Sequence, residues 1–180
     1  EVSLREFQKG RKIDFADIQK LLEKYKKKSF GGTELNEYDV ITNSRIGYFY
    51  SDAYEKRDEL YVDRDFQFIL TYEKNPAAIL SFCPDGDGIL VSQIQGVKGM
   101  KDSLAPLKWS RALLNLATTW ASVKGVPEIR VLPHKMNSYK IVRENTNGAK
   151  FYYDITAERE GFSYDEVRSL YVKELGGSKE

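Results

Sequence analysis

The order of the elements between residues 66 and 162 limits most strongly the fold that this chain can form. Apolar and polar side chains alternate over 66–72, and two further apolar runs follow at 77–82 and 89–95. Alternation with a period of two is typical of strands. Only short segments rich in Pro, Asn, Asp and Gly separate these runs. Because such short connections join neighbouring antiparallel strands, we predict an antiparallel meander.

A long apolar helix and one more strand follow the meander. Residues 106–124 place apolar side chains on most of the helix circumference and leave a narrow polar strip. Pro106 suits the first helical position, where its missing N–H would be unpaired anyway. We expect this helix to be buried against the sheet. The strand predicted at 128–132 then returns by a right-handed crossover and pairs in parallel with 89–95.

The N-terminal part contains one amphipathic helix. Apolar residues share one face over 15–27, directly after Asp14, which suits the N-cap position. Residues 33–64 show no clear period apart from a short strand predicted at 46–50. A small helix or a loop over a site would both fit the polar stretch 51–59.

The C-terminal part combines a loop, a helix and a segment with two interpretations. Polar residues 134–148 predict a surface loop, and residues 149–160 predict a helix. In the tail, Ser163-x-x-Glu166 matches a capping box and predicts a helix. Residues 170–172, Leu-Tyr-Val, instead favour a strand.

Composition and charge exclude several classes of function. The 180 residues are 41% apolar and 31% charged, which is typical of one folded domain. The net charge of +1 gives no overall attraction to nucleic acid, so a nucleic-acid partner is the weakest hypothesis. The basic run from Lys24 to Lys28 is expected to be the solvated end of the first helix, where cations suit the dipole.

The same composition bears on location. Cys83 is the sole cysteine, so no intrachain disulfide forms, and we expect it to be a buried structural thiol. No segment has the roughly 20 apolar residues that a membrane span needs, and the start lacks a secretory pattern. These features predict a cytoplasmic protein with no membrane partner. With one histidine and one cysteine, no metal site is expected.

The element order resembles a known family. Antiparallel strands followed by a helix, a strand and a second helix ending in Gly161-Phe162 resemble the acyl-CoA-binding core of the GNAT N-acyltransferase family. The resemblance covers about residues 66–162. It implies an α/β (α+β) fold with a mixed, mostly antiparallel central sheet flanked by helices. Residues 1–180 would then form a single domain, with 1–64 as the N-terminal helix and a variable acceptor-side region.

The resemblance also implies a cofactor site. GNAT proteins bind acyl-CoA where a strand splays from its neighbour and the next helix begins. The matching positions, for acetyl-CoA or another acyl-CoA, are Ile94, Gln95, Gly96, Val97, Lys98, Gly99 and Lys108, with Lys101 as a further phosphate contact. The family's phosphate loop has Gly or Ala where this chain has Lys98, and several residues delay the helix. A plain strand-to-helix connection is the alternative interpretation.

The catalytic positions match the family less closely. Tyr153, two turns before Gly161-Phe162, is the candidate general acid that the resemblance implies. The predicted strand 89–95 contains no carboxylate, and Asp87 or Glu128 would have to act as a base through water. His134 follows a predicted strand and is expected on a loop surface.

We therefore predict an N-acyltransferase that moves an acetyl or other acyl group from acyl-CoA to an unidentified amine on a small molecule or a peptide. The alternative is a catalytically inactive GNAT-fold protein used for binding or assembly. The missing strand carboxylate and the altered phosphate loop motivate that alternative.

Overall fold

A computed structural model describes residues 6–8, 10–13, 18–28, 34–48, 61–138, 143–144 and 147–176. Among them, the main sheet has the strand order β1-β2-β5-β6-β7-β8-β10-β9. Its strands in chain order are β1 (Arg11–Lys12), β2 (Tyr38–Asn43), β5 (Phe66–Tyr72), β6 (Asn75–Asp85), β7 (Gly88–Gly96), β8 (Glu128–Val131), β9 (Ser163–Asp165) and β10 (Leu170–Glu174). Only β7 and β8 pair in parallel, and the other pairs of this sheet are antiparallel. The predicted mixed, mostly antiparallel sheet is confirmed.

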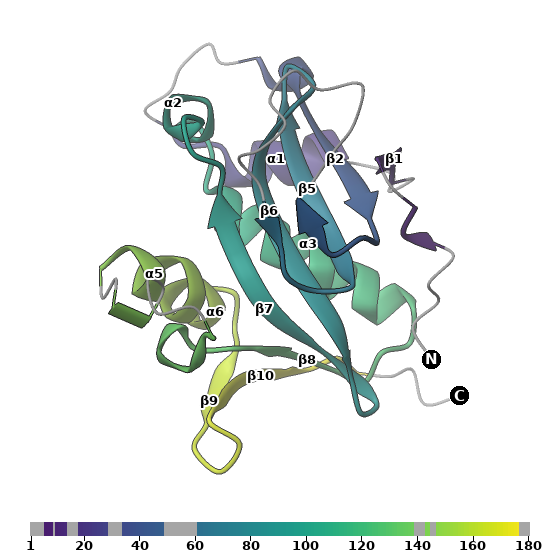
Figure 1. Cartoon of the computed structure of the whole chain (residues 1–180), viewed down its shortest axis with the longest axis vertical. Helices are drawn as coiled ribbons and strands as arrows, with labels where there is room; N and C mark the ends of the chain where they lie inside the picture. The colour runs from purple at the N-terminus through teal and green to yellow at the C-terminus, as the bar shows by residue number, and fades with distance from the viewer. Residues whose placement is uncertain are drawn as a thin grey trace.

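Helices and turns flank this sheet (Figure 1). They are α1 (Ile18–Tyr25), η2 (Leu35–Glu37), α2 (Lys101–Leu104), α3 (Trp109–Val123), η3 (His134–Met136), α5 (Gly148–Lys150), the π turn η4 (Phe151–Ile155) and α6 (Thr156–Arg159). In the view of Figure 1, α1 and α3 lie behind the sheet. A separate two-stranded pair, β3 (Gly47–Tyr48) with β4 (Tyr61–Val62), lies in front. In the described ranges, no helix is long and apolar enough to cross a membrane.

An aromatic cluster fills the space between the sheet and α3. The ring of Phe7 lies 5.1 Å from that of Trp120 and 5.2 Å from that of Phe66, between centroids. Phe82 stacks against the same tryptophan at 5.4 Å. These rings are almost fully buried. Each pair contributes about 0.5–1.5 kcal/mol beyond its buried area. The predicted alternation of 66–72 is confirmed, because Phe66 and Phe68 share this face.

The opposite face of the sheet is polar along one line. Asn43, Gln67, Ser81 and Gln93 stand directly opposite one another on β2, β5, β6 and β7. All four are at least 96% buried. Such a row is costly unless its groups bond to one another. These side chains bond to one another in part. Ser81 Oγ lies 2.9 Å from Gln93 Oε1, and the Asn43 amide donates to Gln67 Oε1.

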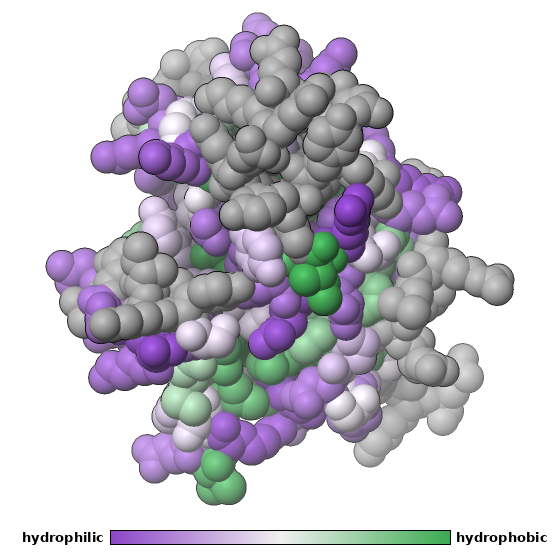
Figure 2. Space-filling view, viewed as in Figure 1, coloured by the Kyte–Doolittle hydropathy of each residue, from purple (hydrophilic) through white to green (hydrophobic). Residues whose placement is uncertain are grey.

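The space-filling view shows a mixed surface on this side. In Figure 2, hydrophobic residues form a band over the lower parts of β7, β8 and β10, and hydrophilic residues surround it.

Cys83, near the end of β6, is only half-buried, so the expectation of a buried thiol is wrong. Partial burial raises the pKa of its thiol, which makes it a poor nucleophile.

The predicted helix 106–124 is wrong at its start. A short helix, α2, comes first, and α3 begins only at Trp109. Pro106 is not at the first helical position, because its carbonyl accepts a hydrogen bond from Lys27 N–H at 2.8 Å. Leu107 forms an isolated antiparallel bridge with Lys26. Partners distant in sequence thus hold residues 106–107 outside the helix. For the same reason, the first helix ends at Tyr25 rather than at residue 27.

The tail forms strands, not the helix that the capping box predicted. Asp165 Oδ1 accepts the N–H groups of Val167 and Arg168, at 2.9 and 3.0 Å. This carboxylate therefore closes a hairpin turn where a helix would begin. The strand preference of residues 170–172 is confirmed, since β10 pairs with both β8 and β9. The predicted strand at 46–50 is described only over β3, because residues 49 and 50 lie outside the described residues.

The close approach of Gly88, the first residue of β7, to the backbone of β8 can be tested. A Cβ added at Gly88 would lie 2.6 Å from the backbone oxygen of Glu128. Backbone atoms yield only by shifting a strand, so Gly88→Ala is expected to lower the free energy of unfolding by about 1–3 kcal/mol. The measurement is urea denaturation. Gly176→Ala is the control, since nothing lies within 4 Å of its added Cβ. Equal midpoints for the two variants would contradict this close approach.

Candidate functional site: the gap between β7 and β8

The parallel pairing of β7 with β8 ends halfway along β7. The register runs from Ile89 opposite Ile129 to Val91 opposite Val131. One more hydrogen bond follows, from Leu132 N–H to Val91 O at 2.8 Å. The strand β7 continues to Gly96, whereas β8 leaves it. Figure 1 shows the two strands diverging, with α5 and α6 beside the opening.

The residues after β8 explain why the pairing stops. Along a strand, backbone donors toward one neighbour recur at every second residue, so the donor after Leu132 is His134 N–H. That N–H instead donates to Asp154 Oδ2 at 3.2 Å, and His134 Nδ1 lies 2.5 Å from the same oxygen. Pro133 between them has no N–H to offer. On the other side, Ser92 forms a bulge in β7. His134 is thus 2% exposed, and the surface position expected for it is wrong.

The end of β7 keeps backbone groups that face away from the sheet. Val97 N–H donates to Ala77 O of β6 at 2.8 Å. Because antiparallel partners alternate, Gln95 also bonds to β6, while Ile94 and Gly96 direct their N–H and C=O groups to the other side. One of these groups is occupied, since Ile94 N–H donates to Tyr153 Oη at 3.1 Å. In the described part of the chain, no strand pairs with this edge of β7 beyond Val91.

Tyr153 closes the deep end of the gap. Its hydroxyl oxygen accepts from Ile94 N–H and from Asn137 Nδ2, the latter at 3.5 Å. Asn137 also donates to Ser92 O at 3.2 Å. Since the hydroxyl accepts both bonds, its own proton is free to be donated. Burial, with a smaller contribution from the charge of Asp63, raises the pKa of Tyr153 to about 12, while the hydrogen bonds from the two donors oppose this shift. The phenol is therefore protonated at neutral pH.

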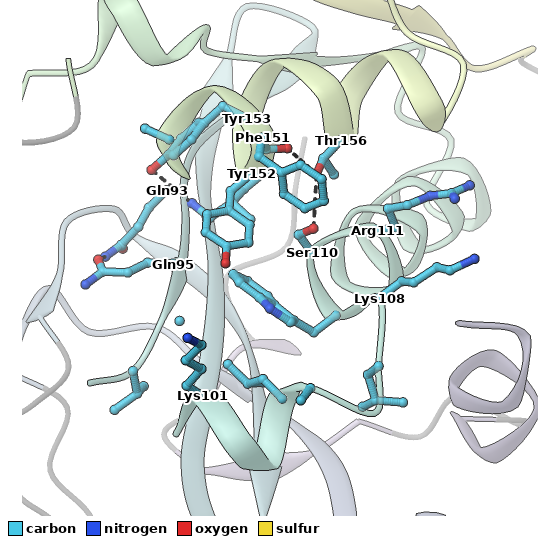
Figure 3. Close-up of a pocket in the computed structure, with 18 of the residues that line it drawn as sticks. Gln93, Gln95, Lys101, Lys108, Ser110, Arg111, Phe151, Tyr152, Tyr153 and Thr156 are labelled. Carbon is cyan, nitrogen blue, oxygen red and sulfur yellow. Dashed lines mark hydrogen bonds between the residues drawn. The ribbon is translucent and has the colours of Figure 1, made fainter. Parts of the chain in front are cut away.

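A π turn aims three consecutive side chains in different directions. Within η4, Tyr152 stacks on Trp109 with ring centroids 4.8 Å apart, Tyr153 reaches β7, and Asp154 binds His134. Thr156 Oγ1 donates to Phe151 O at 3.0 Å (Figure 3). A π turn of this kind is frequent at functional sites.

The open edge of β7 borders a cavity of about 860 Å³. Its walls are the end of β7, the loop to α2, the start of α3 and the π turn. Every residue predicted for the cofactor or the catalytic role lines it, namely Ile94, Gln95, Gly96, Val97, Lys98, Gly99, Lys108 and Tyr153, and so does Lys101. The structure thus brings together in one place the residues that the sequence proposed. In Figure 3, Gln93 and Gln95 lie on one side and Lys108 and Arg111 on the other.

The cavity is positively charged. Of the described residues that line it, six are basic and none is acidic: Lys27, Lys98, Lys101, Lys108, Arg111 and Arg159. Arg111 is neutralised by Glu160, with Nε 2.7 Å from Oε1. For Lys98, Lys101 and Lys108, no carboxylate of the described residues lies within 4 Å. Such a cavity suits a ligand with several negative charges.

The basic run from Lys24 to Lys28 is not only a solvated helix end. Lys27 lines the cavity, which corrects the expectation for that residue. No local sequence pattern indicates this position, because a long-range backbone contact with Pro106 brings Lys27 there.

The two carboxylates considered as bases lie elsewhere. Glu128 binds the guanidinium groups of Arg130 and Arg168, and Asp87 Oδ1 lies 3.5 Å from Arg130 Nη2. Neither carboxylate lines the cavity, so neither is placed to act there. Both are held by arginines that also stabilise the end of the sheet.

Asp63 is a carboxyl group that the sequence did not single out. Its Oδ1 accepts from Ser81 Oγ at 3.0 Å, and burial raises its pKa. It follows β4 in a stretch without periodicity, which left no sequence pattern to find it. Asp63 does not line the cavity, although its charge acts on Tyr153.

No protein-family model and no curated protein sequence matches this chain. Solved structures do match. The chain is similar to GNAT N-acetyltransferases. A GNAT family N-acetyltransferase from Escherichia coli in complex with CoA superposes with a TM-score of 0.42 and 11% identity, covering 62% of this chain and 59% of that one.

Two further solved acetyltransferase structures are similar to this chain. For the ribosomal-protein-S18-alanine N-acetyltransferase from Escherichia coli, the TM-score is 0.42 at 16% identity, over 63% of this chain and 72% of that one. For nourseothricin acetyltransferase, it is 0.42 at 16% identity, over 78% of this chain and 100% of that one.

The raised pKa of Tyr153 predicts a change of stability with pH. The unfolded side chain loses its proton near pH 10 and the folded one near pH 12. Between these values the unfolded chain deprotonates first, so the free energy of unfolding should fall as pH rises. The Tyr153→Phe variant lacks this contribution. Its stability deficit relative to wild type, measured by urea denaturation at pH 9 and 11, should therefore shrink. A deficit that stays constant would contradict the burial of a protonated phenol.

Proposed function

We propose that this protein is an N-acyltransferase that transfers an acetyl or other acyl group from acyl-CoA to a primary amine of a small molecule or a peptide. The observation that carries the proposal is the edge of β7 that no described strand pairs with, and that opens into a cavity whose described lining residues include six basic and no acidic ones.

The unpaired edge suits the pantetheine arm of an acyl-CoA. This arm contains two amide groups, which pair with an exposed strand edge as an added strand does. Ile94 C=O and the backbone of Gly96 face the side that β8 has left. Gly96 lacks a side chain at a crowded position, since a Cβ would lie 3.2 Å from Leu104 Cδ1 and 3.6 Å from Trp109 Cζ2. Gly96 is nevertheless partly exposed and lines the cavity, so a ligand there would lie beside its backbone.

The loop after β7 suits the diphosphate. Residues 98 and 99 are exposed, and Lys98 and Lys101 have no carboxylate partner among the described residues. Consecutive backbone N–H groups and ammonium groups are the usual partners of phosphate oxygens. Lys98, where the family pattern has Gly or Ala, adds a charge to this loop without filling the cavity.

Tyr153 is proposed to protonate the leaving group. In the reaction, the amine nitrogen attacks the thioester carbonyl carbon, the C–S bond breaks, and the thiolate takes a proton. Two donors hold the Tyr153 oxygen at the deep end of the gap, and its own proton is free for the sulfur. Tyr153 then regains a proton from water, and the amine must also lose one. Because none of the described lining residues is a carboxylate, we assign no general base and expect this proton to leave through water.

The amine is proposed to enter from the side of Tyr61 and Gln93. Both line the cavity, and Gln93 Nε2 donates to Tyr61 O at 2.7 Å. Gln93 is also the last member of the polar row on the face opposite α3. This side therefore joins the deep end of the gap to the polar face of the sheet.

Binding of the thioester gives the first test. A ligand at 100 times its dissociation constant stabilises the fold by about 2.7 kcal/mol. Acetyl-CoA at millimolar concentration is therefore expected to raise the melting temperature by several degrees. ATP, which carries phosphates but no pantetheine arm, is the control and should raise it less. An unchanged melting temperature with both acetyl-CoA and CoA would remove the basis of the proposal.

Turnover gives the second test. Tyr153→Phe removes the donated proton and is expected to lower kcat about 100-fold over a panel of amines, with little change in the affinity for acetyl-CoA. Tyr164→Phe, an exposed residue of β9 outside the cavity, is the control. Activity of Tyr153→Phe equal to wild type would refute the acid role. CoA binding without turnover in wild type would instead indicate a binding or assembly protein.

A further inference from the structure

The end of α1 reaches the cavity through a short ladder with the α2–α3 connection. Lys27 N–H donates to Pro106 O and Lys108 N–H donates to Tyr25 O, both at 2.8 Å. Between these bonds, Lys26 pairs with Leu107. This ladder fixes Lys27 at the cavity wall. The other described lining residues are Tyr61 and residues within 93–111 and 149–159, so Lys27 comes from a distant part of the chain.

A second set of contacts anchors the same end of α1. Tyr25 Oη donates to Glu160 Oε2 at 2.8 Å, and Arg111 Nε donates to Glu160 Oε1 at 2.7 Å. The Arg111 guanidinium also lies 5.6 Å from the centre of the Tyr25 ring. Glu160 and Arg111 therefore neutralise each other within this anchor. They leave the lysines beside them uncompensated.

Lys27 and Lys108 are the uncompensated charges at this wall. Both side chains are exposed, and within the described ranges no carboxylate lies within 4 Å of either. Lys98, on the loop after β7, and Lys101, the first residue of α2, form a separate basic pair. In Figure 3, Lys101 lies below the end of β7, whereas Lys108 lies on the side of the cavity opposite Gln93 and Gln95.

Two separate basic pairs match a ligand with two separate phosphate groups. CoA carries a diphosphate in the chain that joins pantetheine to ribose, and a phosphomonoester on the ribose 3′-oxygen. Pantetheine beside Ile94 and Gly96 would leave the diphosphate next to the loop that carries Lys98. The 3′-phosphate would then bind to the remaining pair, Lys27 and Lys108.

On the basis of the proposed function, we infer that Lys27, presented by α1, binds the 3′-phosphate of CoA together with Lys108 and makes the protein prefer CoA over 3′-dephospho-CoA. The N-terminal helix thus contributes directly to cofactor selection. Its ladder with residues 106–108 holds the lysine in place.

Calorimetric titration of the full chain with CoA and with 3′-dephospho-CoA tests this inference. Wild type is expected to bind CoA about threefold to tenfold more tightly, with a smaller ratio at higher salt. Lys27→Ala keeps the backbone N–H that bonds to Pro106, so the ladder should survive. It is expected to weaken CoA binding by a similar factor, to leave binding of dephospho-CoA nearly unchanged, and so to abolish the preference.

Lys28→Ala is the matched control. It removes the same charge from the next residue, which is exposed and does not line the cavity, so the preference for CoA should persist. A preference retained in Lys27→Ala, or absent in wild type, overturns the inference and leaves the proposed function standing. Failure of wild type to bind either ligand overturns both. Melting temperatures of the three proteins show whether each variant is folded.

Discussion

The hydrogen bond from His134 N–H to Asp154 decides where the parallel ladder ends. A regular parallel pair would have used this N–H to continue along β7. Pro133 cannot replace it, and the imidazole of His134 is bound to the same carboxylate. The strand β8 must therefore turn away after Leu132. The unpaired end of β7, the cavity beside it and the position of the π turn all follow from this divergence.

The carboxylate of Asp154 links two parts of the site. Asp154 is the neighbour of Tyr153 in the π turn. The contact that ends the ladder therefore also fixes the position along β7 at which the Tyr153 hydroxyl meets Ile94. Tyr152, on the other side, packs against Trp109 at the start of α3. The turn is thus held at both ends, and the Tyr153 hydroxyl has a defined place at the bottom of the gap.

The positive charge of the cavity is local and does not appear in the overall composition. The net charge of the chain is +1, yet the described cavity walls carry basic and no acidic residues. The acidic residues gather elsewhere, for example Asp85 and Glu128 around Arg130 at the opposite end of β7. Net charge therefore argues against a nucleic-acid partner but says nothing about an anionic cofactor. The separation of charge arises from the fold.

Much of the fold was predictable because it depends on local patterns. Alternation over 66–72 and the short turns after it predicted the meander, and the apolar helix between two strands predicted the parallel pair. The candidate cofactor positions from Ile94 to Gly99 were selected through the resemblance to the GNAT family, which implies a cofactor site at the end of this strand. Tyr153 was also selected, although its spacing to Gly161 differs from the family pattern, and a π turn now accounts for its direction. Their roles in binding and catalysis stay predictions.

The errors at Pro106 and His134 share one cause, which is contact between residues far apart in the chain. Pro106 was predicted to begin a helix, but its carbonyl accepts a hydrogen bond from Lys27 N–H. His134 was predicted to lie on the surface, but its side chain is bound by Asp154. The sequence alone determined which segments become strands and helices, because periodicity and turn residues act over a few positions. Only the tertiary structure decided where β8 leaves β7 and which lysines surround the gap, because backbone hydrogen bonds between distant segments set both.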